Sequence, residues 1–272
     1  MRIGVRLLIG LLLLATCSAA MAREPDLKVT ARNVLATHLD SIVSVKIVSR
    51  QHLVMMGRDM PRNEQKVDVV GTVIGADGLT VVSNFMANPM AGLAAMMGNA
   101  NNPSRMRIES DITSVQITES DGTEIPAHIV LRDTDLDLAF IKPLKKPARP
   151  FSFIALTNPS PAPRLLDDLV FIGRTSRAED RVGTVSLGTV AAVVRKPRLC
   201  YIPSTRIQAS GLGCPVFNAR GEAVGLCVVR VNANHSGSAV NPLLGGLQTV
   251  VLPVTDISDL AAEAETPRRP NP

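Results

Sequence analysis

The side chains with the most reactive chemistry in this sequence belong to its four cysteines and four histidines. Thiolates act as nucleophiles and metal ligands, and imidazoles act as general bases and metal ligands. The sequence has no CxxC motif, no Cys/His spacing typical of zinc sites and no His-x-x-x-His pair. We therefore predict no metal site and no cofactor. The histidines are His38, His52, His128 and His235, and the cysteines are Cys17, Cys200, Cys214 and Cys227.

Methionine is the second distinctive residue type, because eight of the ten methionines fall between Met55 and Met106. Flexible thioether side chains adapt to varied apolar partners, so the cluster predicts a binding surface for a protein or peptide. Two alternatives stay open, a loop packed on its own apolar side chains and a Cu(I) site, since thioethers are soft ligands. The residues assigned to this surface are Met55, Met56, Met60, Met96 and Met97.

The composition limits the classes of protein that need to be considered. The chain has 272 residues, of which 46% are hydrophobic and 19% charged, so it has enough apolar material for a core and is not a disordered protein. The formal charge of +5 falls to +3 once Arg2 and Arg6 are removed. Aromatic residues make up only 3% and do not interleave with a basic stripe, so no nucleic-acid partner is predicted.

The amino terminus predicts an export signal over residues 1–22. Arg2 and Arg6 form a basic region, residues 7–15 are apolar, and residues 20–22 form a small-x-small cleavage site. We expect an exported protein, periplasmic or secreted, without a membrane span after cleavage. A retained anchor and lipidation at Cys17 are the alternatives. An oxidising compartment would allow one disulfide among Cys200, Cys214 and Cys227.

The elements that must position any site are short β-prone runs, arranged in two similar halves. Val-rich runs flank Asp77-Gly78, and strand-like runs flank Asp121-Gly122, both typical of hairpins. The pattern favours two β-barrels or a pair of sandwiches. We expect a first barrel at 23–143 with a loop at 51–66 and an insertion at 88–106, a Pro-rich connection at 144–163, a second barrel at 164–260, and a disordered tail at 261–272.

Three segments resemble the HtrA/Deg group of trypsin-like serine proteases. Residues 70–87 resemble the segment that leads to Thr-Asn-x-His, whose His is the general base. Residues 117–142 resemble "SDG…D-x-x-x-DLA", whose second Asp orients that His. Residues 210–225 resemble "GNSGGP…G", whose Ser is the nucleophile. The resemblance implies an all-β fold of two six-stranded antiparallel barrels with short terminal helices. We expect no PDZ domain of the kind found in the group, because the chain ends soon after residues 252–254.

The catalytic positions of that group are altered in this sequence. The resemblance places Met86 at the general base, Asp137 at the orienting acid and Leu212 at the nucleophile. Methionine has no titratable nitrogen and leucine has no nucleophilic atom, so the triad chemistry is lost. The resemblance also places Ser210, Gly211, Gly213 and Cys214 in the oxyanion loop. Ser210 and Cys214 replace glycines there, and Gly211 is expected to provide the flexible point.

These observations predict an exported pseudoprotease that binds or scaffolds a protein or peptide partner, with an oligomeric state that the sequence does not define. The main alternative is a hydrolase with rearranged catalytic residues, built on Cys214 as a thiolate nucleophile. The weaker alternative is the Met-rich copper-binding protein.

Overall fold

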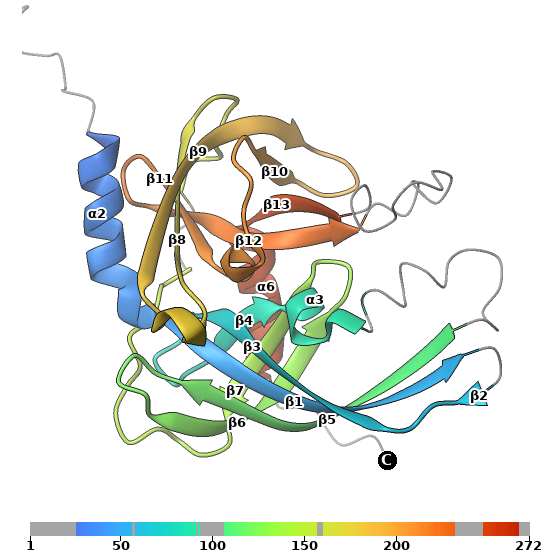
Figure 1. The fold of residues 1–272 in the computed structure, drawn as a ribbon. Coiled ribbons are helices and arrows are strands. Elements are labelled where there is room, and N and C mark those ends of the chain that lie inside the picture. The colour runs from blue at the N-terminus through green and yellow to red at the C-terminus, as the bar shows by residue number, and fades with distance from the viewer. Residues whose placement is uncertain are drawn as a thin grey trace, which may run out of the picture.

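The first half of the chain forms a six-stranded antiparallel barrel in the computed structural model (Figure 1). The structure describes residues 26–55, 58–90, 92, 106–156, 160–231 and 247–266. The barrel order is β1-β3-β4-β7-β6-β5, closed by pairing of β1 with β5, and the short strand β2 extends the edge of β1. The strands are β1 (Ile42–Met55), β2 (Arg58–Asp59), β3 (Asn63–Val73), β4 (Thr80–Ser83), β5 (Met106–Thr118), β6 (Glu124–Asp133) and β7 (Leu138–Pro143).

The second half closes a separate six-stranded barrel in the order β10-β13-β12-β11-β8-β9. The prediction of two six-stranded antiparallel barrels is therefore confirmed. The strands are β8 (Asp168–Arg174), β9 (Gly183–Val194), β10 (Cys200–Pro203), β11 (Pro215–Asn218), β12 (Ala223–Val231) and β13 (Leu247–Pro253).

Each barrel encloses its own core of β-branched and aliphatic residues, as alternating strands require. Val45, Ile47 and Ile141 are fully buried in the first barrel, and Leu169 and Val216 are fully buried in the second. A third cluster joins the facing sides of the barrels and the two long helices. These helices are α2 (Leu27–His38), which packs on β8 and β9, and α6 (Val254–Glu265), which packs on β12 and β13.

Arg174 ties the two barrels together from β8. Its guanidinium donates from Nε to the carbonyl of Ile42 at 2.6 Å and from Nη2 to the carbonyl of Leu39 at 2.8 Å. A third bond runs from Nη1 to the carbonyl of Arg181 at 3.0 Å. Arg174 is 8% exposed, so these bonds satisfy a buried charge with three main-chain acceptors.

Two expectations about local structure are wrong. The loop expected at 51–66 is largely strand, because β1 continues to Met55 and pairs with β3 as far as Gln51 and Asn63. The tail expected to be disordered from residue 261 is helical to Glu265. Ala261 and Ala264 pack against the inter-barrel cluster and so hold the last turns of α6 in place.

Within the described residues, no helix combines the length and apolar character that a membrane crossing requires.

Candidate functional site

Asp137 is the only acid that the sequence placed in the triad, and it lies buried between the barrels at the turn from β6 to β7. Its side chain accepts three hydrogen bonds. Ser83 Oγ donates to Oδ2 at 2.7 Å, the N–H of Phe85 donates to Oδ1 at 2.6 Å, and the N–H of Val229 donates to Oδ2 at 2.8 Å. Ser83 and Phe85 belong to the first barrel and Val229 to the second, so the carboxylate joins the two.

The environment of Asp137 acts on its pKa in two opposing directions. Asp137 is 5% exposed, and this burial raises its pKa from 3.8 to about 6. The hydrogen bonds from Val229, Phe85 and Ser83 favour the charged form and limit that rise. The acid also has a left-handed backbone with φ of 59°, which is unusual for a residue with a side chain. Its carbonyl accepts from the N–H of Asn84 at 3.0 Å, which fixes this conformation.

No imidazole among the described residues hydrogen-bonds to Asp137. His38 stacks on Phe217 with ring centroids 5.1 Å apart, and burial lowers its pKa. His52 lies on β1 between the carboxylates of Asp59 and Glu109, at 3.4 and 3.8 Å. His128 is an exposed residue of β6, and His235 lies outside the described residues. In the same ranges, no three His, Cys, Asp or Glu side chains gather to hold a metal ion.

Met86 and Leu212 meet in an apolar cluster beside Asp137. Met86 lies in the short helix α3 (Asn84–Ala87), and its partly buried side chain packs against the cores of both barrels. The cluster of the second barrel that it contacts contains Leu212, which is 7% exposed. The two positions that the resemblance assigned to a base and a nucleophile therefore hold apolar side chains in contact with the same core.

The loop at 210–214 is held by internal hydrogen bonds. The N–H of Gly211 donates to Gln208 at 2.8 Å, that of Gly213 to Cys227 at 2.7 Å, and that of Cys214 to Gly211 at 3.3 Å, in each case to a carbonyl. The donors of Gly211 and Cys214 serve the turn itself and that of Gly213 ties the loop to β12, so all three are occupied. The loop contains the short 3-10 helix η4 (Ala209–Gly211), and Ser210 is exposed.

Gly213 provides the left-handed turn in this loop, whereas Gly211 lies in the short helix η4. Gly213 has φ of 86° and lies against the first barrel. A Cβ on Gly213 would come within 2.8 Å of the carbonyl of Val70 and 3.1 Å of the nitrogen of Ser83. Its own carbonyl accepts from Thr72 Oγ1 at 2.7 Å. Only glycine allows this close approach between the barrels.

Cys214 is buried and poorly suited to act as a nucleophile. It is 2% exposed, and burial raises the pKa of its thiol to about 12. Its sulfur lies 3.6 Å from the carbonyl of Ser210, an acceptor and not a base. Burial and the proximity of Cys214 also raise the pKa of Cys227. The three described cysteines, which include Cys200, are free thiols, so no disulfide joins them.

The residues assigned to the Met-rich surface are only partly described. Met60 lies between β2 and β3 and is 42% exposed. The backbone of Met55 ends β1 and pairs with β2 and β5. Met56, Met96 and Met97 lie outside the described residues, as do the signal segment and Cys17.

Ser83 and Val229 are the site residues that sequence reasoning missed. The residue type of Ser83 alone predicts no role for it, yet it is fully buried and donates to the acid. The signal was present, because Ser83-Asn84 occupies the Thr-Asn position of the resembled motif. Val229 contributes only its main-chain N–H, which side-chain type does not reveal.

Comparison with known proteins gives one family match. A family model described as a trypsin-like peptidase domain matches residues 69–226, more than half of the chain. The matched range contains Met86, Asp137 and Leu212. No curated protein matches the chain.

Proposed function

Since the chain belongs to the trypsin-like peptidase domain family, we propose that it is an exported member that has lost peptidase chemistry and binds a polypeptide partner. The relation to the HtrA/Deg group is part of this proposal and rests on the "SDG…DLA" motif at 120–139. Export rests on the signal-like residues 1–22.

The observation that carries the proposal is the set of donors around Asp137. In a serine peptidase this acid accepts a hydrogen bond from the general base and stabilises the imidazolium that forms. Here its oxygens accept from Ser83 and from the N–H groups of Phe85 and Val229. Met86 and Leu212 supply neither a proton acceptor nor an attacking atom. The carboxylate therefore joins the two barrels, and no described histidine is placed for it to orient.

The Cys214 hydrolase gains no support from the geometry. A thiolate nucleophile needs a depressed pKa, which comes from an adjacent base or cation. The pKa of Cys214 is instead raised to about 12, and no described histidine hydrogen-bonds to its sulfur.

Activity-based labelling tests the loss of chemistry. The purified protein is incubated with a fluorophosphonate probe and with unfolded casein, and trypsin serves as the active control. We expect no covalent adduct in the intact-mass spectrum and no new casein fragments. A stoichiometric adduct, or cleavage that co-purifies with the protein through two orthogonal columns, would overturn the proposal. Repeating any positive assay with Cys214→Ala assigns the activity to the thiol or excludes it.

A further inference from the structure

The first barrel has an open seam between β5 and β6. These strands pair only from Val115 with Ala127 to Thr118 with Glu124. If the same register continued, Ser114 would face His128 and the last pair would be Ser110 with Arg132. No described strand pairs with these two edges. Each strand is paired only on its other side, β5 with β1 and β6 with β7.

Two β-bulges account for the opening. In the pairing of β1 with β5, Val48 faces Ser114 and Ser49 faces Ile112, so Thr113 is an extra residue. In the pairing of β6 with β7 the register shifts between Ile129 and Leu131, which leaves Val130 extra. Bulges bend a strand and increase its twist. Both extra residues lie within the unpaired stretches, so the two strands bend at the point where their pairing ends.

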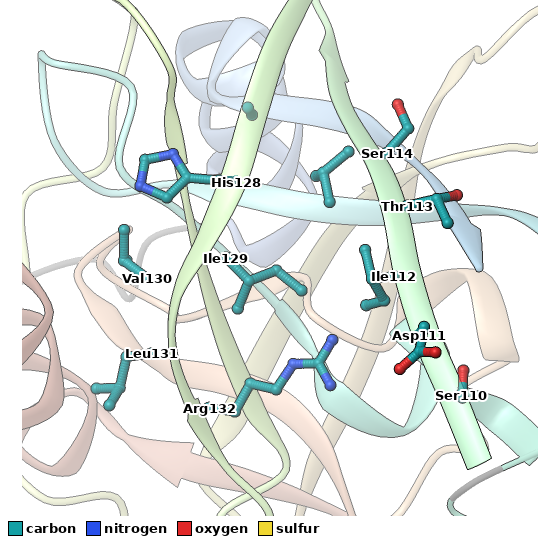
Figure 2. Close-up of a pocket in the computed structure, with 12 residues that line it drawn as sticks. Ser110, Asp111, Ile112, Thr113, Ser114, His128, Ile129, Val130, Leu131 and Arg132 are labelled. Atoms are coloured by element: carbon teal, nitrogen blue, oxygen red, sulfur yellow. The ribbon is translucent and has the colours of Figure 1, made fainter. Parts of the chain in front are cut away.

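The seam forms a cleft of about 620 Å³ lined by residues 110–115 and 127–132. This volume lies in the range of ligand-binding sites. Figure 2 shows Ile112 of β5 and Ile129 of β6 projecting into the space between the strands, together with Arg132, whereas His128 points away. Ile112 and Ile129 also contact the barrel core against which Met86 packs.

Two polar groups that line the cleft, at residues 110 and 132, lack a protein partner among the described residues. Ser110 Oγ is buried without a hydrogen bond. No described carboxylate lies within 4 Å of the Arg132 guanidinium, and partial burial lowers the pKa of Arg132. Arg132 is itself exposed to solvent, as are the other ionisable residues of the lining, Asp111 and His128. A carboxylate that enters the cleft here would accept a charge-assisted hydrogen bond from Arg132.

We propose that the seam binds an extended polypeptide segment by strand addition, with an apolar side chain between Ile112 and Ile129 and an acidic side chain at Arg132. Strand edges present rows of N–H and C=O groups, and an extended main chain is the ligand that satisfies them. Five unpaired positions at about 3.3 Å each give a contact of roughly 17 Å, a typical strand length. This inference rests on the proposed function, since it gives the binding of a polypeptide partner a location.

Hydrogen–deuterium exchange with defined peptides tests the proposal. The probes are a short peptide of alternating Val and Thr with a central Glu, the same peptide with Lys in place of Glu, and a third with two Pro residues. We expect the Glu peptide to protect the amides of 110–114 and 128–132. The Lys peptide should bind about tenfold more weakly, since it loses a charge-assisted hydrogen bond, and the Pro peptide should not protect. The proposal is overturned if the Glu peptide protects only amides of β12, or if it protects no amides at all.

Variants then separate the seam from general effects on folding. Ile112→Cys/Ile129→Cys, whose side chains both project into the space (Figure 2), should lose peptide binding once oxidised or bridged across the seam by a short methanethiosulfonate linker, and regain it on reduction. The matched control is Arg50→Cys/Glu64→Cys, on a paired position of β1 and β3, which should bind in both states. Arg132→Gln should weaken the Glu peptide about tenfold and leave the Lys peptide unchanged. Binding that survives the oxidised seam variant would contradict the proposal. Concentration-dependent protection without peptide would also contradict it, because two copies would then pair edge to edge.

The same samples distinguish the two proposals. Mass spectrometry of the peptides reports cleavage, which would refute the noncatalytic function even if the seam were protected. Intact peptides without seam protection would refute the seam site and leave the noncatalytic function standing.

Discussion

Replacement of Ser83 by Ala should destabilise the fold in a pH-dependent manner. Ser83 is fully buried, and its hydroxyl donates to the Asp137 carboxylate at 2.7 Å. Loss of a hydrogen bond to a charged group costs about 1.5–3 kcal/mol, whereas loss of a neutral one costs about 1 kcal/mol. Because the pKa of Asp137 is about 6, the acid is ionised in the folded chain at pH 7.5 and mostly protonated at pH 5. The loss from this bond should therefore be about 2–3 kcal/mol at pH 7.5 and about 1 kcal/mol at pH 5, and loss of the N-cap bond that Ser83 Oγ accepts from the N–H of Met86 adds about 1 kcal/mol at both pH values.

The sign of this pH dependence follows from linkage. Burial raises the pKa of Asp137 above its ordinary value of 3.8. Its stabilising contribution is therefore complete below about pH 4 and is lost as pH rises through about 6. Without the hydroxyl of Ser83 the pKa of Asp137 rises further. A rise of one pKa unit corresponds to a loss of about 1.4 kcal/mol of unfolding free energy above pH 7.

Urea unfolding at the two pH values measures both quantities. Ser49→Ala is the matched control, because Ser49 is also buried and has no side-chain hydrogen bond among the described residues. Its destabilisation should be small and independent of pH. An equal loss of unfolding free energy at pH 5 and pH 7.5 in Ser83→Ala would refute the assignment of an ionised Asp137 as the acceptor.

Three further outcomes are expected. Gly213→Ala should lower the unfolding free energy by about 2 kcal/mol or more, since it combines a left-handed φ with a clash at Val70. Gly122→Ala, with a similar φ and open space around it, should cost only about 1 kcal/mol by the same urea assay. Cys214 should resist iodoacetamide at pH 8 until urea unfolds the chain, as peptide mapping would show; rapid native labelling would contradict its raised pKa. Arg174→Met should remove three hydrogen bonds to main-chain carbonyls, among them that of the buried Ile42, and lower the melting temperature by at least 5 °C in calorimetry; an unchanged melting temperature would count against the inter-barrel role.

The sequence predicted the double barrel because its signals are local. Asp77-Gly78 and Asp121-Gly122 form turns with positive φ at Gly78 and Gly122, as a hairpin requires. The extension of β1 to Met55 escaped prediction, since the segment is polar and Met-bearing. Its pairing with β3 and β5 supplies hydrogen bonds that composition does not reveal.

The site, like the fold, could be predicted only in part. The placement of Asp137 beside the positions of Met86 and Leu212 followed from motif order in the resembled family, and the geometry brings these residues to one region between the barrels. The donors of Ser83 and Val229 did not follow, because contacts that join distant segments depend on tertiary packing. The seam likewise arises from two bulges, and a bulge shifts register without any fixed sequence signature.

The position of Asp137 has a practical consequence for genetic experiments. In an active serine peptidase, replacement of this acid can leave the geometry of the site intact while it removes most of the activity. Here the same substitution would remove an acceptor shared by both barrels and leave the N–H groups of Phe85 and Val229 unsatisfied. A cellular phenotype of Asp137→Ala would therefore report reduced protein abundance, and it could not serve as a test for residual proteolysis.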